Sequence, residues 1–319
     1  MPDAARIAGA SRLPAKWRGA SVAIGNFDGV HRGHQSVLSA ALDAARGAAS
    51  PVLVLTFEPH PREVFSGEDV FRLTDPGEKA AVLGRIGFDA VVEQPFDRDF
   101  ASLTAEAFID EVLVAGLGAS HVAVGDAFRF GSKRAGDAAL LARRLPATIV
   151  PAERAGADAI SSSRIREALT AGDAAMAAEL LGRRWRVAAE VRHGRKVGRT
   201  IGYPTANMAL PPSTGLAHGI YAVRFRREGG TLHDGVASFG RRPTFDDGAP
   251  LLETFLFDFD GDLYGERACV TLFERLRGEE RFDGVEALVA QMDRDAAHAR
   301  AVLAAARPLS DLDRAMNFA

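Results

Sequence analysis

Short apolar runs of β-strand character alternate with helical patterns along the first half of this chain of 319 residues. Asp75 and Pro76 form a helix-start signal before the helical pattern at 78–86, and Thr104 is a candidate cap for a helix over 105–114 that Gly116 would end. Strand and helix alternating at this spacing predict an α/β fold, a parallel sheet with helices on both faces. Ligands bind such sheets beyond the carboxyl ends of the strands. The runs lie at 22–24, 52–56, 90–92, 121–124 and 147–150.

The pattern changes near residues 181–184. From Arg186 to about Leu276 the apolar segments are short and turn residues separate them, which predicts an antiparallel barrel or sandwich. Apolar residues at helical spacing then predict a last helix over 285–305. We therefore expect two domains, 1–182 and 183–319. The short segments lie at 219–225, 235–238, 251–259 and 268–273.

Composition excludes several classes of protein. The net charge of −3 argues against nucleic-acid binding by bulk electrostatics. Cys269 is the only cysteine, so neither a disulfide within the chain nor a cysteine zinc cluster is possible. The N-terminal apolar run at 7–10 is too short for a signal peptide, and no run is long enough to span a bilayer. We expect a soluble cytoplasmic protein without a membrane partner.

The stretch GNFDGVHRGH, residues 25–34, stands where the first predicted strand becomes a helix. Glycine lets the backbone turn sharply and approach a ligand, and a helix N-terminus presents unpaired N–H groups to an anion. His31 and His34 are three residues apart, so they share a face of the first helical turn. A bound phosphate would raise their pKa values and favour the charged form. The alternatives are a turn with two surface histidines and a metal held by the histidine pair, for which no further ligand has evident spacing.

A second stretch, ISSSRIR at 160–166, begins another helix after the last strand of the sheet. Serines at a helix start are often only caps. Here Arg164 and Arg166 follow them, and the guanidinium group matches phosphate oxygens. Both stretches together favour nucleotide binding.

The second half has its own candidate site at 194–207, GRKVGRTIGYPTAN. Gly194, Gly198 and Gly202 are spaced by four, as in a loop that wraps a ligand, although a tight barrel turn would use them equally well. Thr205 and Asn207 alternate, so on a strand both would face one side and offer oxygen to Mg²⁺. Seven basic residues between 183 and 199 fit in part a solvated barrel face. Nucleic-acid binding by this run is an alternative that the sequence favours less, because Trp185 is its only aromatic residue.

These stretches resemble one family. His31 to His34 is similar to the H-x-G-H motif of nucleotidylyltransferases, and 160–166 to their I-S-S-T-x-x-R motif, with Ser163 in place of threonine. The full 25–35 string, TFEPHP at 56–61 and GDAFRFG at 125–131 resemble the bifunctional riboflavin kinase/FMN adenylyltransferases, also called FAD synthetases. The resemblance covers about 22–299 and implies a Rossmann-like N-terminal domain that transfers AMP from ATP to FMN, which gives FAD and pyrophosphate.

The resemblance also implies the roles of residues in this first domain. His31 and His34 would contact the ATP phosphates, together with Gly33. Ser162, Ser163 and Arg166 would hold the triphosphate from the other side, while Gly25, Phe27 and Asp28 would form the floor of the nucleotide pocket. Phe57, His60, Asp126 and Phe128 are weaker candidates for lining it, and an isolated phenylalanine is commonly core. Ala127 stands where the family commonly has an acidic residue.

In the second half, GYPTAN at 202–207 resembles the G-x-P-T-A-N motif of flavokinases, and Glu253 occupies the family's catalytic L-E-x-H position with Phe255 in place of histidine. Asp262 to Gly265 also matches the family. The resemblance implies a barrel of riboflavin kinase type that phosphorylates riboflavin to FMN with ATP. Glu253 would be the general base, because a hydroxyl must lose its proton. Thr205 and Asn207 would position Mg²⁺ and, with the three glycines, the ATP phosphates.

Three other functions stay open on the sequence. The chain could keep the fold and lack one activity, for which Ala127 is the reason. A flavin-binding or nucleotide-binding regulator would have lost charged site residues, yet His31, Arg166 and Glu253 are present. A nucleic-acid-modifying enzyme with a basic barrel would bind RNA in a salt-dependent manner.

Overall fold

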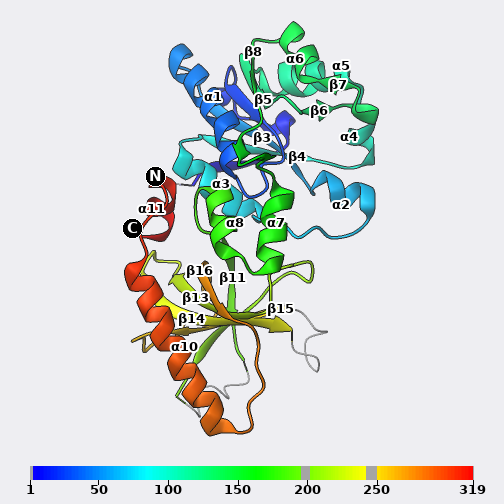
Figure 1. Cartoon of the computed structure of the whole chain (residues 1–319). Helices are drawn as coiled ribbons and strands as arrows, with labels where there is room; N and C mark the ends of the chain where they lie inside the picture. The colour runs from blue at the N-terminus through cyan, green and yellow to red at the C-terminus, as the bar shows by residue number, and fades with distance from the viewer. Residues whose placement is uncertain (1–2, 195–201, 242–249, 319) are drawn as a thin grey trace. The chain divides into compact units, whose positions relative to one another are not determined.

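The computed structural model describes residues 3–194, 202–241 and 250–318. It divides into two compact units: unit 1 comprises Met1–Val70 and Thr74–Ser162, and unit 2 comprises Phe71–Leu73 and Ser163–Ala319. Figure 1 shows a sheet covered by helices in the first unit and a barrel with a long helix in the second.

Unit 1 is built on a parallel sheet of six strands in the order β1-β4-β3-β2-β5-β8. The parallel sheet is confirmed, as are all five predicted strands. The edge strand β1 was not predicted, because three of its four residues are exposed and it lacks a buried apolar run. The strands are β1 (Ala5–Ala8), β2 (Ser21–Ile24), β3 (Val52–Glu58), β4 (Ala90–Pro95), β5 (His121–Gly125) and β8 (Ala147–Val150).

Helices cover this sheet, and one apolar core forms against η3 and α6 from strand residues such as Val22, Leu53 and Val122. That core contains no residue of α1 or α3, which contact the strands separately. The helical segments are η1 (Ala10–Arg12), η2 (Ala15–Trp17), α1 (Arg32–Ala48), α2 (Pro61–Ser66), α3 (Pro76–Ile86), α4 (Arg98–Ser102), α5 (Ala105–Ala107), η3 (Phe108–Leu117), η4 (Ser132–Arg134) and α6 (Ala138–Arg144). Two short strand pairs complete the unit: β6 (Arg129–Phe130) with β7 (Gly136–Asp137), and β9 (Arg154–Ala155) with β10 (Asp158–Ala159).

Capping signals located two of these helices correctly, and one predicted stop was wrong. Asp75 caps α3 and Thr104 caps α5, as the sequence predicts. Gly116 does not end the helix that follows, because η3 is a π-type segment that continues to Leu117 and stops at Gly118 with φ 59°. The role of Gly116 is close packing, since a Cβ there would lie 3.0 Å from the Cβ of Ala10.

Unit 2 contains a closed antiparallel barrel in the order β11-β12-β15-β14-β13-β16, which confirms the barrel and excludes the sandwich. Strand β15 ends at Leu256, three residues before the predicted end. Asp258, which follows, has φ 54° and turns the chain away from the sheet. The strands are β11 (Arg186–Arg192), β12 (Thr205–Ala209), β13 (Gly219–Arg226), β14 (Leu232–Arg241), β15 (Pro250–Leu256) and β16 (Arg267–Arg277).

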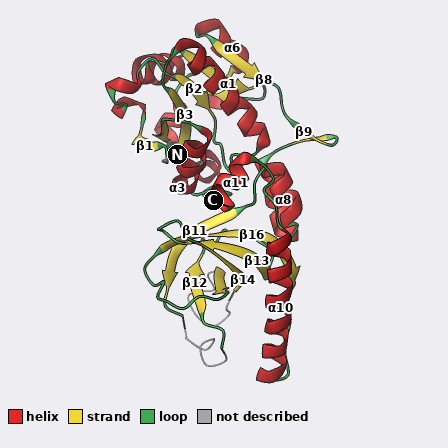
Figure 2. Cartoon of the chain, turned by 90° about the vertical axis from the view of Figure 1, so that its left-hand side faces the viewer, coloured by secondary structure: helices red, strands yellow, loops and turns green. Residues whose placement is uncertain are grey.

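The predicted last helix is found as α10 (Val285–Ala305), which packs along β13, β14 and β16 and runs beside the barrel in Figure 2. Its buried Ala299 and Leu303 form a small core with Ala222 and Phe257. The described residues of this part of the chain also form α7 (Ser162–Ala171), α8 (Ala174–Leu181) and α11 (Asp311–Asn317). Across the described residues, no helix combines the length and apolarity needed to cross a bilayer.

Candidate functional site

The turn between β2 and α1 lies where the strand order of the sheet reverses, since β2 pairs with β3 on one side and β5 on the other. Such a switch point is where open α/β sheets bind ligands. Three residues of this turn have positive φ: Phe27 at 47°, Gly29 at 85° and Val30 at 46°. Phe27 and Val30 are buried at 1% and 0% exposure, so packing holds this unusual backbone in place.

The two histidines begin α1 as expected. His31 is the N-cap, and its Nδ1 accepts a hydrogen bond of 3.2 Å from the backbone N–H of His34. That bond requires Nδ1 to be unprotonated, so a neutral His31 carries its proton on Nε2. The two rings stack with centroids 3.5 Å apart. His31 thus caps the helix through Nδ1, and its ring is buried at 5% exposure against the ring of His34.

His34 lies in a less polar place. Burial lowers its pKa well below the usual value, and the nearby His31 and Lys79 charges act in the same direction. The edge of Phe27 meets the His34 ring at 5.2 Å. These effects favour the neutral form of the ring near pH 7. The upward pKa shift expected with a bound phosphate remains a prediction.

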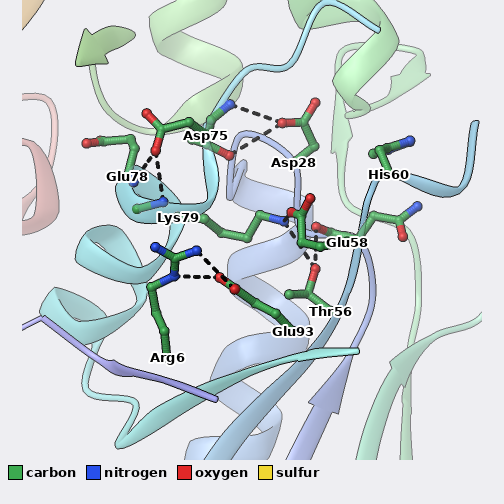
Figure 3. A network of polar contacts seen from close by, with 12 residues as sticks. Arg6, Asp28, Thr56, Glu58, His60, Asp75, Glu78, Lys79 and Glu93 are labelled. Atoms are coloured by element: carbon green, nitrogen blue, oxygen red, sulfur yellow. Dashed lines mark hydrogen bonds and ion pairs between the residues drawn. The ribbon is translucent and has the colours of Figure 1, made fainter. Parts of the chain in front are cut away.

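Hydrogen bonds from neighbouring segments hold the turn (Figure 3). The Asp28 carboxylate accepts from the N–H of Thr74 at 3.0 Å, and the Thr74 hydroxyl accepts from the N–H of Gly29 at 3.1 Å. The Ser162 hydroxyl donates to the carbonyl of Asp28 at 2.9 Å. Asp28 and Ser162 therefore shape the backbone of the turn. Gly25 is needed there because a Cβ would lie 3.2 Å from the Phe27 ring.

A cavity of about 910 Å³ opens beside Gly25 and Asn26. Phe57 and Phe128, two of the predicted pocket residues, line this cavity, and Phe57 is at the same time part of the core. Ala127 lines it too, so the departure from the family pattern falls on the cavity wall. Further aromatic residues that sequence reasoning missed complete the wall: Phe65, Phe96, Phe100, Phe108 and Phe130.

Other predicted residues of this unit lie elsewhere. Asp126 is exposed and is not among the residues that line the cavity. His60 caps α2, where its Nδ1 accepts from the N–H of Arg62 at 3.2 Å. Gly33 lies against the His31 ring, since a Cβ on Gly33 would be 3.4 Å from atoms of that ring. Ser163 and Arg166 belong to unit 2, where Ser163 is exposed and Arg166 Nε donates to the carbonyl of Phe71 at 2.5 Å.

In unit 2, strand pairing brings the predicted kinase residues together. Asn207 of β12 pairs with Glu253 of β15, and Thr205 pairs with Phe255. Ser238 of β14 pairs with Glu253 on the other side. Because paired residues point to the same face of a sheet, these five side chains share one face of the barrel wall.

Asn207 occupies an unusual position on this face. It is 6% exposed, its Nδ2 donates to the carbonyl of Thr205 at 3.0 Å, and its Oδ1 has no hydrogen-bond partner among the described residues. Gly194 lies against it, since a Cβ there would come within 2.5 Å of Asn207 Nδ2. Gly202 has φ 85°, a conformation that favours glycine. The prediction for Gly198 falls outside the described residues.

Two cavities meet at Thr205. The first, about 700 Å³, lies between the barrel wall and α10 and is lined by Glu253, Ser238 and Phe255 together with apolar side chains of α10. The second, about 280 Å³, is lined by Pro204, Thr254 and the segment 259–264. Thr205 lines both. Thr205 therefore stands at the border between a cavity with a mainly apolar wall and a smaller, more polar one.

Several residues of the first barrel cavity carried no sequence signal. Arg277 of β16 forms an ion pair of 2.7 Å with Asp295 of α10, and both line the cavity. Tyr203 donates a hydrogen bond to Asp293, and burial raises the Tyr203 pKa to about 12 with the aid of this bond. Its ring packs on Phe255 at 4.7 Å. These contacts link residues far apart in sequence, so no local pattern predicts them. For α10 the sequence shows only apolar residues at helical spacing, which does not identify the side chains that line the cavity.

Among the described residues, no group of three or more His, Cys, Asp or Glu side chains is placed to hold a metal ion. A hard cation at the barrel site would depend on the hydroxyl and amide oxygens of Thr205 and Asn207.

Comparisons with known proteins identify both units. A family model for FAD synthetase matches residues 13–164, and one for riboflavin kinase matches residues 181–303. The chain is 40% identical to the bifunctional riboflavin kinase/FMN adenylyltransferase of Haemophilus influenzae over 290 residues, which are 89% of this chain and 94% of that protein. It is also 40% identical to the protein of that description from Escherichia coli K12, over 92% of this chain and 96% of the relative.

A solved structure agrees over nearly the whole chain. The crystal structure of a protein described as a macrolide-efflux protein from Streptococcus pneumoniae matches with a TM-score of 0.82 and 32% identity, covering 94% of this chain and 99% of that one. On the two family models and the relatives together, the chain belongs to the family of bifunctional riboflavin kinases/FMN adenylyltransferases.

Proposed function

We propose that this chain phosphorylates riboflavin to FMN in its barrel and then transfers AMP from ATP to FMN in its parallel-sheet domain, releasing FAD and pyrophosphate. The observation that carries the proposal is the barrel face shared by Thr205, Asn207 and Glu253, on which Thr205 lines two cavities, in a chain whose sheet also holds the histidine-capped turn. The sheet domain would transfer AMP to FMN, and the barrel would supply that FMN.

For the kinase reaction, we place riboflavin in the 700 Å³ cavity and the nucleotide in the 280 Å³ cavity. The larger cavity has the apolar wall that a three-ring flavin needs. Glu253 lies in the flavin cavity, where its carboxylate would accept the proton of the ribityl 5′-hydroxyl as that oxygen attacks the γ-phosphorus and ADP leaves. Thr205, at the border of both cavities, would contact the phosphate in transfer.

The Thr205 and Asn207 oxygens fit a magnesium ion, because Asn207 Oδ1 is a buried acceptor without a partner among the described residues. A hard cation takes such oxygen ligands. When bound, Mg²⁺ would neutralise charge on the phosphates. Gly194 would keep Asn207 in place by close packing, and with Gly202 and Gly198 it would bring the backbone close to the nucleotide.

For the adenylyltransferase reaction, the phosphates of ATP would bind at the N-terminus of α1, where His31 presents its Nε2–H. His34, Gly33 and the hydroxyl and guanidinium groups of Ser162, Ser163 and Arg166 would complete that contact. The FMN phosphate oxygen attacks the α-phosphorus and pyrophosphate leaves, so no covalent enzyme intermediate is needed. Alignment of the reactants and neutralisation of charge supply the catalysis.

The flavin of FMN would occupy the 910 Å³ cavity with its aromatic wall. Phe57 and Phe128 would contact its rings there. Asp126 and His60 do not line this cavity and would contribute to flavin binding from positions beside it. The proposed division of activities is 1–182 for adenylylation and 183–319 for phosphorylation, which the two family matches support. A cytoplasmic location is part of the proposal, because both reactions consume ATP.

Two variants test the assignment of two separate sites. Glu253→Gln keeps the shape of the side chain and removes the base, so we expect FMN formation to fall by at least about 100-fold while added FMN is still converted to FAD. His31→Asn keeps a capping acceptor but removes the imidazole, so we expect the reverse. Glu274→Gln, an exposed carboxylate on β16, is the control. Loss of both activities in either folded variant would contradict the assignment.

A further inference from the structure

Lys79 is a buried cation behind the turn that carries the histidines. Its side chain is only 5% exposed, and Nζ lies 3.3 Å from the carboxylate of Glu58 at the end of β3. Nζ also donates to Thr56 Oγ1 at 3.1 Å. Figure 3 shows Lys79 reaching from α3 toward Thr56 and Glu58. Burying such a group carries a large desolvation cost, which these contacts offset.

The contacts of Lys79 continue into the turn. Thr56 is fully buried, and its hydroxyl donates to the carbonyl of Asn26 at 3.0 Å. The Thr56 oxygen therefore accepts from Lys79 while its hydrogen goes to the backbone, which gives a directional chain of hydrogen bonds from α3 to the turn. Asn26 precedes the residues with positive φ and lines the 910 Å³ cavity.

The same short segment holds the other side of the turn. Thr74, five residues before Lys79, exchanges hydrogen bonds with Asp28 and Gly29. Asp75 caps α3 and accepts from the N–H groups of Gly77 and Glu78. Residues 74–79, at the start of α3, thus hold both Asn26 and Gly29 in place.

Lys79 also acts on the histidines through its charge. It is one of the groups that lower the pKa of His34, after burial and the charge of His31. Charged or titratable groups on every element around this junction include Asp28, His31 and His34 of the turn and α1, Glu58 and His60 after β3, and Asp75, Glu78 and Lys79 of α3. Removing the cation would favour proton uptake by His34.

We propose that Lys79 is a positioning residue for the adenylyltransferase reaction, which holds the turn at residues 26–34 and the His34 ring in the arrangement that receives the phosphates of ATP. The chain lacks the lysine of a phosphate-binding loop, since no Gly-Lys pair occurs in the sequence. Instead, Lys79 of α3 supplies a positive charge on the inner side of this turn. This inference rests on the proposed adenylyltransferase function.

A merely structural role is the alternative, in which Lys79 only neutralises Glu58. Lys79→Met alone does not separate the two roles, because it also takes the lysine partner away from the partly buried Glu58 carboxylate. The double variant Lys79→Met with Glu58→Gln removes both charges together and avoids that penalty. If the role is only neutralisation, the double variant recovers wild-type adenylylation.

The first measurement is steady-state FMN adenylylation by the full chain, with ATP varied, and riboflavin phosphorylation by the same samples. We expect kcat/KM for ATP in adenylylation to fall at least tenfold in both the single and the double variant. Phosphorylation stays within twofold and reports that the barrel is folded, and an unchanged far-UV circular dichroism spectrum reports that the sheet domain is folded. The control is Arg6→Met with Glu93→Gln, which removes an ion pair between β1 and β4 with a more exposed cation. It should leave both activities within twofold.

The second measurement follows the His34 ring by NMR titration, with His34→Gln to assign its signal. We expect the titration midpoint of His34 to move to higher pH in Lys79→Met and in the double variant, and to stay in place in the Arg6/Glu93 control. Wild-type adenylylation in the double variant, or an unchanged midpoint, would overturn the proposal.

Failure of the proposed function looks different from failure of this inference. If the wild-type chain does not convert added FMN to FAD, the adenylyltransferase function itself fails. If the wild-type chain is active and the double variant equals it, only the role of Lys79 fails.

Discussion

Asn207 is held in place by close packing of one glycine, Gly194. The amide is buried, one end of it is bonded to the Thr205 carbonyl, and Gly194 packs directly on it. A buried acceptor without a partner usually costs stability. Its presence here is explained if the oxygen is reserved for a ligand, as the proposed magnesium contact requires.

Gly194→Ala tests this packing. The added Cβ would overlap Asn207 Nδ2 at 2.5 Å and displace the amide, so we expect phosphorylation of riboflavin to fall at least tenfold and the magnesium concentration for half-maximal rate to rise. Gly229→Ala is the matched control, because a Cβ there meets nothing within 4 Å. Kinetics of FMN formation at varied Mg²⁺ measure both effects, and equal activity of the two variants would contradict the proposed role of Asn207.

At the scale of elements, the start of α3 connects stability to the proposed phosphate site. Asp75 accepts from Gly77 N–H at 2.8 Å and Glu78 N–H at 3.0 Å, and Pro76 occupies the first helical position. This cap fixes the first turn of the helix that carries Lys79. The turn between β2 and α1 therefore depends on a helix that follows it by more than forty residues.

Asp75→Ala should loosen this helix start. Loss of an N-cap costs about 0.5–2 kcal/mol, which corresponds to about two- to thirtyfold faster amide exchange at 76–86 if the helix opens locally. Asp75→Asn keeps a capping oxygen and should lose less. Hydrogen exchange followed by mass spectrometry measures the effect, and adenylylation should fall with it while phosphorylation does not. Unchanged exchange in Asp75→Ala would contradict the role of this cap.

The same elements show what the sequence could predict. Strand β2, the cap of α3 and the full length of α10 follow from local patterns of apolar residues and capping side chains. Strand β1 could not be predicted, because it joins the sheet by backbone pairing with β4 and has little buried surface.

The residues of the two candidate sites also differ in whether the sequence could predict them. Motif resemblance located His31, Thr205 and Glu253 in the sequence, while their neighbours come from long-range pairing. The register of β12 with β15 places Asn207 opposite Glu253, and Lys79 meets Thr56 across 23 positions of sequence. His60 illustrates the opposite case, since the motif suggested a pocket residue and the structure shows a helix cap.

At the scale of the whole molecule, the two reactions form an ordered pair, because the product of the barrel is the substrate of the sheet domain. The two compact units divide after Ser162, within the serine-rich motif. The FAD synthetase model ends at residue 164 and the riboflavin kinase model begins at residue 181. Helix α7 is tied to the barrel side, where the Thr170 hydroxyl donates to the carbonyl of Gly215 at 2.7 Å. The proposed adenylyltransferase residues Ser163 and Arg166 are thus carried by a helix with contacts in unit 2.

The central claim is that one chain performs both steps in sequence. The most direct measurement is to incubate the purified protein with riboflavin, excess ATP and Mg²⁺ and to resolve the flavins by chromatography over time. We predict that FMN appears first and then declines as FAD accumulates, and that added FMN is converted to FAD without riboflavin. FMN that accumulates without FAD would contradict the account of the sheet domain and point to Ala127, and no flavin product at all would contradict the account of both sites.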